Sequence, residues 1–148
     1  MNSSNVLKNL RSAATAEIQA IAIYEAECFW MRRSPHFEFL TSIYLEEIEH
    51  GQFISQFINV SAVEIWIQQF IGWILGTLLT LLPWKLLCRV QSWAESQAAD
   101  IYSKALISVE AHPEWQRNST LIAGLKHAIE SELGHSALFA ARYAQLNP

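Results

Sequence analysis

The fold is decided by a stretch that occurs twice, AEIQAIAIY at residues 16–24 and AESQAADIY at residues 94–102. The two copies agree at six of nine positions. Each copy lies in a longer segment whose apolar residues recur every three or four positions, the period of an amphipathic helix. The repeat therefore predicts that the chain is built from two similar helical units.

A second shared element follows each copy of the repeat. Residues 47–50 read EIEH and residues 132–135 read ELGH, so each half carries one Glu-x-x-His sequence. A Glu and a His three residues apart project from one helix face, with Cβ atoms about 5–6 Å apart. We therefore expect each half to be a helical hairpin with a Glu in its first helix and a Glu-x-x-His in its second.

The spacing brings the carboxylates of each hairpin nearly level. If the first hairpin turns near Ser34, Glu17 lies seventeen residues before the turn and Glu47 thirteen after it. At 1.5 Å per residue their heights differ by about 6 Å, and the same reckoning for the second hairpin gives about 5 Å.

Caps and breakers predict four main helices and no strand, because no stretch alternates with period two. Ser34-Pro35 is typical of a helix start and His112-Pro113 of a helix end. The expected helices are 6–31 with Ser3 or Ser4 as its cap, 35–58, 83 or 84–111, and a fourth that begins between 114 and 119 and ends near 145. This predicts one all-α domain over 1–148, with hairpin one at 4–58, an apolar crossover at 59–83 and hairpin two at 84–146.

The composition agrees with a single helical domain. Of 148 residues 51% are hydrophobic and 16% charged, and thirteen of the fourteen acidic residues are Glu, a helix former. The net charge of −4 and the scattered basic residues argue against nucleic acid as a partner. Cys28 and Cys88 are too isolated for a disulfide framework or a zinc ribbon, and we expect two buried, reduced thiols.

Residues 65–84 run for twenty positions without a charge and include three Trp, a length that can span a membrane. Gly72, Gly76 and Pro83 interrupt the run, which predicts two shorter helical pieces with a bend. Three interpretations stand open: a membrane span, a buried crossover helix, and an apolar lobe in a membrane interface. A span is the least favoured, because it would separate the two hairpins. The polar residues 1–8 are not followed by an apolar signal segment, so secretion is not predicted.

One Glu from each of two helices and a Glu-x-x-His from each of the other two form the set with which helix bundles hold two metal ions. Clustered carboxylates in a core would repel one another and lose hydration, and two divalent cations neutralise them together. The alternative is that these side chains lie on solvated helix faces. The predicted metal ligands are Glu17, Glu47, His50, Glu95, Glu132 and His135.

Other polar side chains are weaker candidates. Tyr24 and Tyr102 each follow a candidate ligand by seven residues, so they are either hydrogen-bond donors to the ligands or core packing. Two further groups are expected at the solvent side or at helix ends: Glu25, Glu27, Glu46 and Glu49, and His36, His112 and His127. Neither a phosphate-binding loop nor a serine nucleophile motif is evident.

On these residues the sequence resembles the ferritin-like di-metal superfamily, and within it the demethoxyubiquinone hydroxylase family of ubiquinone biosynthesis. The likeness covers most of the chain and rests on Glu17, Ala20, Ile23-Tyr24 and the glycine-containing apolar segment 71–76. It implies a ferritin-like four-helix bundle, two iron ions bridged by Glu47 and Glu132, and a membrane-facing entry for a polyprenyl quinone at the apolar crossover. The chain departs from the family at Ile101, where the family has His, and at Thr15-Ala16, where it has Ala-Gly.

The leading expectation is a non-haem di-iron monooxygenase or oxidoreductase that uses O2 and an external electron donor on a hydrophobic, quinone-like substrate. Glu47, Glu132, Tyr24 and Tyr102 are its candidate catalytic side chains, and manganese would suit the ligands as well as iron. We expect a cytoplasmic protein, peripheral on the inner face of the membrane or paired as a homodimer through the crossover. The alternatives are a rubrerythrin-like peroxidase or ferroxidase, and a non-catalytic bundle that binds metal or docks on a membrane or partner.

Overall fold

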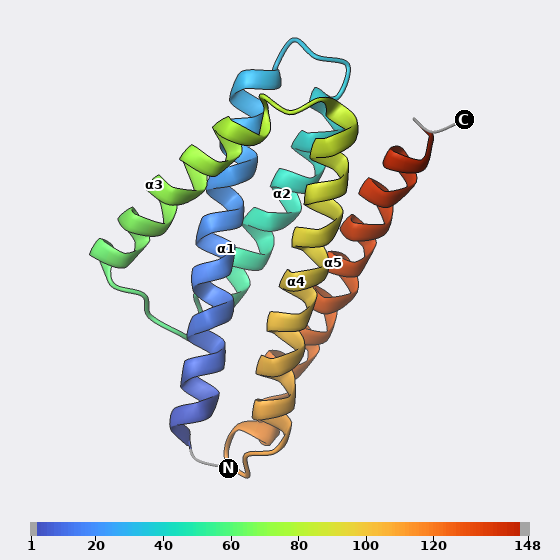
Figure 1. The fold of residues 1–148 in the computed structure, drawn as a ribbon. Helices are drawn as coiled ribbons and strands as arrows, with labels where there is room; N and C mark the ends of the chain where they lie inside the picture. Colours follow the sequence, from blue (N-terminus) through green and yellow to red (C-terminus); the bar gives the residue numbers. More distant parts are fainter. Residues whose placement is uncertain (1–2, 146–148) are drawn as a thin grey trace.

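The computed structural model describes residues 3–145, which form five α-helices and one short 3-10 helix, with no strand among them (Figure 1). The predicted all-α class is confirmed. Residues 1–2 and 146–148, which include the last residue of the predicted second hairpin, lie outside the described part. The elements are α1 (Ser3–Met31), α2 (Phe37–Ile54), α3 (Ala62–Leu79), α4 (Trp84–Glu110), η1 (Trp115–Arg117) and α5 (Ser119–Gln145).

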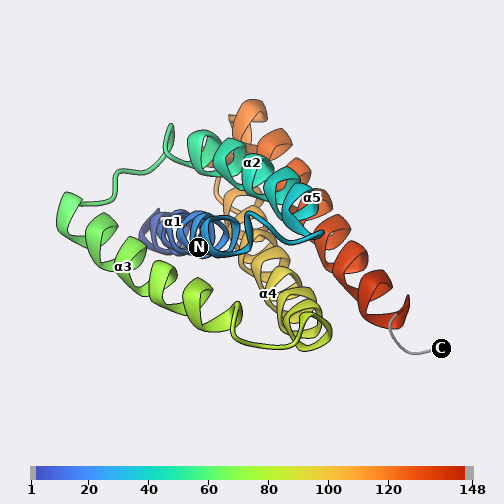
Figure 2. The same ribbon diagram turned by 90° about the horizontal axis from the view of Figure 1, so that it is seen from above.

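The helices form two antiparallel pairs, α1 with α2 and α4 with α5 (Figure 1). The backbones of the two pairs approach each other mainly where α1 packs on α4, whereas those of α2 and α5 come close at few positions. Helix α3 lies against the outer side of α1, away from α5 (Figure 2). Four helices therefore surround the middle of the molecule, and the crossover is an outer layer.

The helix ends follow the predicted punctuation at most positions. Helix α4 begins after Pro83, and α5 ends at Gln145. The first helix already includes Ser3 and Ser4, so neither serine precedes it as the predicted cap. The second helix begins at Phe37 instead of residue 35, because Ser34 and Pro35 form a turn in which Ser34 Oγ accepts a hydrogen bond from the backbone N–H of His36. That helix also ends at Ile54, four residues before the predicted end.

Residues 62–79 of the apolar crossover form one unbroken helix, so the predicted bend at the glycines is wrong, whereas the predicted interruption at Pro83 is confirmed. Gly72 and Gly76 do not interrupt α3. They are its buried positions, where the helix presses on α1. A Cβ on Gly72 would collide with the backbone carbonyl of Gln19, and one on Gly76 with that of Ile23. The two glycines therefore permit a close approach of two helix backbones.

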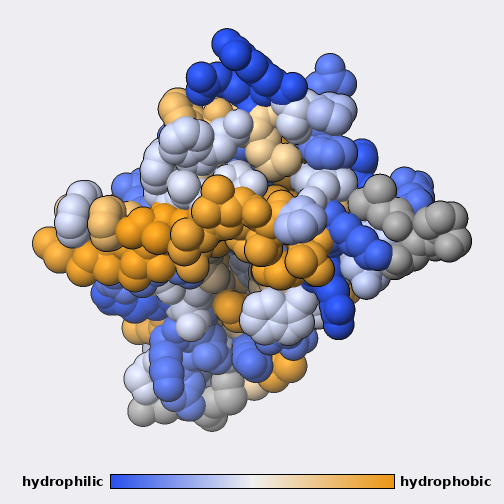
Figure 3. Space-filling model, turned by 45° about the horizontal axis from the view of Figure 1, so that its top comes forward, coloured by the Kyte–Doolittle hydropathy of each residue, from blue (hydrophilic) through white to orange (hydrophobic). Residues whose placement is uncertain are grey.

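The prediction of a buried crossover helix is also wrong, because most of α3 faces away from the protein. Its window of mean hydropathy 1.4 is long and apolar enough to cross a membrane by length and composition, yet only 11% of it is buried. Trp66 and Phe70 are more than half exposed, and Figure 3 shows the apolar surface as a continuous band. Whether lipid or a second copy of the chain covers this surface stays a prediction.

Two apolar clusters fill the space among α1, α2, α4 and α5. One contains Leu10, Ile54 and Leu125, and the other contains Leu40, Leu87 and Phe139. On each of the four helices, the predicted metal ligands lie between these two clusters along the chain. The fold thus surrounds the predicted ligands with apolar layers at both ends.

Candidate metal centre

All the predicted ligands are buried in the middle of the molecule. Helices α1 and α4 each contribute one carboxylate, and α2 and α5 each contribute a Glu and a His three residues apart. None of the side chains lies on a solvated face, so the alternative of exposed ligands is wrong. The exposed fractions are 2% for Glu17, 1% for Glu47, 4% for His50, 4% for Glu95, 0% for Glu132 and 2% for His135.

These side chains form two groups that can each hold a metal ion. The first group is Glu17, Glu47, His50 and Glu132, and the second is Glu47, Glu95, Glu132 and His135. Within each group one donor atom per residue lies within 4.8 Å of every other. The two groups share Glu47 and Glu132, so the structure places these two carboxylates between the two candidate positions.

Each histidine faces the carboxylate of the opposite hairpin. His50 Nδ1 lies 3.2 Å from Glu132 Oε1, and His135 Nδ1 lies 3.2 Å from Glu47 Oε1. The two imidazole rings are 6.2 Å apart between centroids. Since each Glu-x-x-His pair stands on one helix face, the antiparallel helices α2 and α5 present them to each other.

The fit to metal ions is tested by the hydrogen bonds of these donors. Buried polar atoms in proteins are nearly always hydrogen-bonded, because an unpaired one loses its water without replacement. Here a set of inward-facing ligand atoms makes no well-oriented hydrogen bond, although two His–Glu pairs among them lie 3.2 Å apart: Glu17 Oε2, Glu47 Oε1, His50 Nδ1, both Glu132 carboxylate oxygens and His135 Nδ1. Carboxylate oxygens and imidazole nitrogens are ligands for iron, manganese and zinc, so these atoms fit divalent cations.

The clustered charges of the site also favour neutralisation by cations. Burial raises the pKa of Glu17 well above its usual range, and the nearby Glu47 carboxylate raises it further. Burial likewise raises the pKa of Glu47 to about 7 and that of Glu132 far above its ordinary value. Without cations, carboxylates packed this closely cannot all be ionised at neutral pH.

The surroundings shift the pKa values of the two histidines in opposite directions. Burial lowers the pKa of His50 to about 4, and the positive charge of His135 contributes to this. Burial also lowers the pKa of His135, but its contacts with Glu47 and Glu95 outweigh that effect and raise it to about 10. In the metal-free protein the His50 imidazole is therefore neutral at pH 7, and the His135 imidazole is doubly protonated and positively charged.

Tyr24 and Tyr102 are hydrogen-bond donors to the site. Tyr24 on α1 donates to Glu95 Oε1 on α4, and Tyr102 on α4 donates to Glu17 Oε1 on α1, with an O···O distance of 2.6 Å in the second bond. Both rings are buried, so the donor and the core-packing interpretations both hold. The Tyr of each copy of the repeat thus donates to the Glu of the other copy, so two reciprocal hydrogen bonds join the hairpins.

Glu46 orients one of the histidines. Its Oε2 lies 3.0 Å from His135 Nε2 and accepts a hydrogen bond from Ser131 Oγ. The Glu46 side chain is 54% exposed, as predicted, but it also fixes the ring that presents Nδ1 to the site. Such a partner is typical of histidines that bind metals. No spacing in the sequence marked Glu46, because it directly precedes the candidate ligand Glu47 and therefore lies on another face of the helix.

Glu27 contradicts the prediction that it lies at the solvent side. It is completely buried, and its Oε1 accepts a hydrogen bond of 2.8 Å from Gln91 Nε2. Glu27 follows Tyr24 by three residues, so the two share the helix face that is turned to the core. Glu25 and Glu49 are exposed as predicted.

The other histidines stay outside the candidate centre. His36 stacks on Trp84 with 3.8 Å between ring centroids, and His112 Nδ1 accepts a hydrogen bond from the backbone N–H of Glu114 after the end of α4. His127 is exposed, and its ring lies 6.4 Å from that of His50.

Cys88 is buried as predicted, while Cys28 is only half-buried, and both are free thiols.

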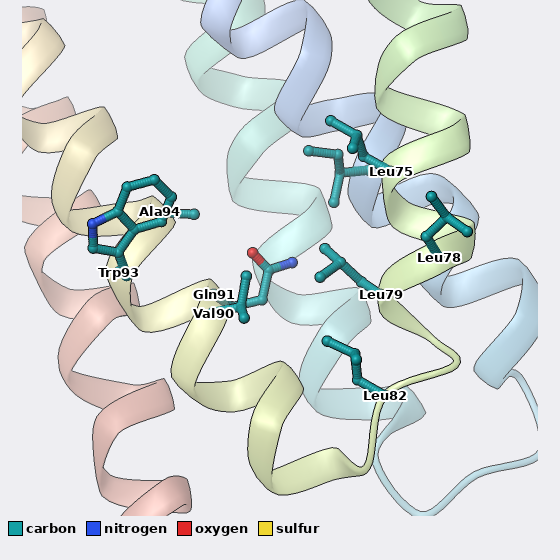
Figure 4. A pocket seen from close by; sticks show the side chains of 9 residues that line it. Leu75, Leu78, Leu79, Leu82, Val90, Gln91, Trp93 and Ala94 are labelled. Carbon is teal, nitrogen blue, oxygen red and sulfur yellow. The ribbon is translucent and has the colours of Figure 1, made fainter.

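Two neighbouring cavities lie between the outer layer and the candidate centre. The larger, of about 430 Å³, lies between α3 and α4 (Figure 4). The smaller, of about 60 Å³, is lined in part by Glu17, Glu47 and Glu95. Both cavities are lined by Ile23, Gln91 and Ala94, so these residues lie where the two cavities adjoin. The larger cavity is lined by Ile23, Leu75, Leu78, Leu79, Leu82, Val90, Gln91, Trp93 and Ala94.

Comparisons with protein-family models, with curated proteins and with solved structures gave no match to this chain.

Proposed function

We propose that the chain is a ferritin-like protein that binds two metal ions and uses them in the O2-dependent oxidation of a hydrophobic molecule. The observation that carries the proposal is the pair of buried donor groups that share Glu47 and Glu132. Two carboxylates common to both groups would bridge the ions, and each group adds one further Glu and one His. This is the ligand arrangement of di-metal carboxylate proteins in helix bundles.

The ferritin-like arrangement is part of the proposal. It is supported by two antiparallel helix pairs joined through a long crossover, and by the sequence repeat that places Glu17 and Glu95 at equivalent positions. The resemblance of the sequence to demethoxyubiquinone hydroxylases points the same way.

We take iron as the metal, with manganese as the alternative that the same ligands allow. Bound iron would supply the electron transfer that reduces O2. Insertion of one oxygen atom into a C–H bond converts the substrate, O2, two electrons and two protons into the hydroxylated product and one water molecule, so an external donor must supply the electrons. Two cations would also neutralise the carboxylates whose burial is otherwise costly.

The protein's own side chains would set the geometry. Tyr24 and Tyr102 hold Glu95 and Glu17 by hydrogen bonds and fix their rotamers. Glu46 holds His135 with Nδ1 toward the site. The apolar clusters at both ends exclude water, which strengthens electrostatic interactions inside.

The hydrophobic substrate is supported by the larger cavity. Its lining is nearly all aliphatic, and Trp93 at its rim is 65% exposed, so an apolar molecule has access from the surface. The adjoining smaller cavity touches three of the candidate ligands. A quinone-like molecule would fit this chemistry.

The experiment is metal analysis followed by an assay for O2 uptake. Aerobically purified protein is analysed for iron and manganese, and its optical spectrum is recorded. We expect about two metal ions per chain, and O2 uptake after chemical reduction of the loaded protein. The double variant Glu47→Ala/Glu132→Ala should lose both ions, whereas Glu25→Ala, an exposed Glu on α1, should keep them.

Other outcomes would select another function. Metal binding with peroxide turnover and no O2-dependent oxidation would favour the rubrerythrin-like alternative. Metal binding with no redox activity would leave a metal-binding bundle, and a chain that binds no divalent metal would overturn the proposal.

A further inference from the structure

The larger cavity holds one amide among apolar side chains. Gln91 lies on α4, and its amide end stands in the space between α3 and α4 (Figure 4). Apart from this amide and the indole of Trp93, the lining consists of Ile, Leu, Val and Ala side chains. Gln91 also lines the smaller cavity, so it stands where the apolar space meets the candidate centre.

The orientation of this amide is fixed from behind. Gln91 Nε2 donates to Glu27 Oε1 at 2.8 Å, which assigns the nitrogen to the Glu27 side. A glutamine amide has a second N–H and a carbonyl oxygen in addition to the N–H used here. These remaining groups are available to a molecule in the cavity.

Glu27 is a buried carboxyl that the candidate metal centre does not use. It is completely buried, and its Oε2 has no hydrogen-bond partner. Burial raises its pKa to about 8, against the opposing effect of the Gln91 bond. Most Glu27 side chains are therefore neutral at pH 7, and a neutral carboxyl can hold Gln91 without placing a charge beside the apolar cavity.

Leaving a polar pair in this position has a cost that core packing alone does not explain. A glutamine and a glutamate buried beside leucines lose hydration that one mutual hydrogen bond replaces only in part. Apolar residues of similar size would fill the same space at lower cost. Gln91 faces the cavity and Glu27 stands behind it, so the pair is accounted for if a bound molecule completes the hydrogen bonds of the Gln91 amide.

We propose that Gln91, held by Glu27, binds the hydroxyl or carbonyl group of an otherwise apolar molecule in the larger cavity. The bound molecule would then present the end that carries oxygen toward Glu17, Glu47 and Glu95. Gln91 touches the ligand, and Glu27 is a positioning residue that acts through Gln91. The orientation toward the metal ions rests on the proposed function, but the binding itself does not.

The test uses two probes that differ by one hydroxyl group, 2-naphthol and naphthalene. Their affinities for the full-length, metal-free chain are measured by equilibrium dialysis. The quantity compared is the ratio of the affinity for 2-naphthol to that for naphthalene. A loss of fold would lower both affinities. A loss of the polar contact lowers only the affinity for 2-naphthol, and the ratio falls with it.

Gln91→Leu should lower this ratio roughly tenfold and leave the affinity for naphthalene within about twofold, because one hydrogen bond to the ligand is lost. Glu27→Leu should lower the ratio less, since it frees the amide without removing it, and Glu27→Gln should keep it. Gln97→Leu, an exposed glutamine on the same helix, is the matched control and should change nothing.

An unchanged ratio in Gln91→Leu, an equal change in Gln97→Leu, or failure of both probes to bind the unmodified chain would overturn the inference. The outcome is separate from that of the proposed function. If the ratio changes as expected but the metal-loaded protein consumes no O2, the proposed function fails and the binding site stands. If O2 is consumed and the ratio does not change, only the assignment of Gln91 fails.

Discussion

At the scale of single residues, the buried carboxylates of the candidate centre can be neutralised either by protons or by metal ions. Burial and mutual repulsion raise the pKa of Glu17, Glu47 and Glu132, so the metal-free site holds protons at pH 7. His135 holds another, because Glu47 and Glu95 raise its pKa to about 10 against the effect of burial. Metal ions bind only the deprotonated ligands, so protons and metals compete for the same atoms.

Metal uptake at pH 7 should therefore release protons, at least about two for each pair of ions. Apparent affinity should fall as the pH is lowered through 7, where Glu47 with its pKa of about 7 becomes protonated. The measurement is calorimetric titration of Fe²⁺ or Mn²⁺ in buffers of different ionisation enthalpy. Heats that do not depend on the buffer would contradict the expectation.

The reciprocal tyrosine bonds lead to a second prediction. Tyr102→Phe removes the hydrogen bond to Glu17 and keeps the buried ring, so the carboxylate loses its orientation while packing is preserved. We expect metal affinity to fall about 10- to 100-fold, the usual effect of losing a group that orients a ligand. Tyr24→Phe should act similarly through Glu95.

The matched control for both tyrosines is Tyr143→Phe. Tyr143 is partly buried near the end of α5, where its ring contacts Lys85, so it lies outside the candidate centre. Metal affinity of this variant should equal that of the unmodified chain. Equal losses in all three variants would show that the tyrosines act on the fold and not on the ligands.

The candidate ligands could be predicted because helical spacing alone specifies which side chains share a face. The repeat and the two Glu-x-x-His sequences identified six positions, and the structure brings all of them together. Glu27 could not be predicted in this way. Its burial depends on Gln91 of a helix 64 residues away, and such a pairing leaves no periodic signal in either helix.

At the scale of the elements, α3 shows how one residue type can have two meanings. A glycine in an apolar helical run either weakens the helix or lets another backbone approach. Sequence alone favoured the first meaning and predicted a bend, whereas Gly72 and Gly76 lie where α3 contacts α1. Helix ends near Pro83 and His112-Pro113 were predictable, because proline acts locally on the backbone.

The packing of α3 on α1 can be tested with two Gly→Ala variants. Gly76→Ala places a methyl group against the carbonyl of Ile23 in α1, and we expect a loss of about 1–3 kcal/mol in unfolding free energy. Gly134→Ala in α5 meets no atom within 4 Å, so it should stabilise the protein by up to about 1 kcal/mol through helix propensity. Urea unfolding followed by circular dichroism gives both values, and a stabilising Gly76→Ala would contradict the close packing.

At the scale of the whole molecule, the candidate centre joins the two helix pairs. The backbones of the two pairs approach each other mainly between α1 and α4, whereas α2 and α5 meet chiefly through side chains. On that side Phe39 packs on Phe139, and polar contacts lie between the apolar clusters, with His50 beside Glu132, His135 beside Glu47, and Glu46 bonded to Ser131. Metal ions held by both pairs would therefore stabilise the association of the halves.

This coupling predicts that metal ions and the two shared carboxylates, Glu47 and Glu132, act on stability in opposite directions. A metal present at about 100 times its Kd should stabilise the folded chain by about 2.7 kcal/mol, which raises the Tm by roughly 5–10 °C in a protein of this size. In a chelator, Glu47→Gln/Glu132→Gln should be more stable than the unmodified chain, because burial raises the pKa of both carboxyl groups, so folding at pH 7 must either bury their charge or bind protons to them. With metal the order should reverse, since the variant gains nothing from cations that it cannot bind. Thermal unfolding of both proteins with chelator and with metal measures all four values, and a variant that is less stable under both conditions would show that these carboxylates serve the fold without metal.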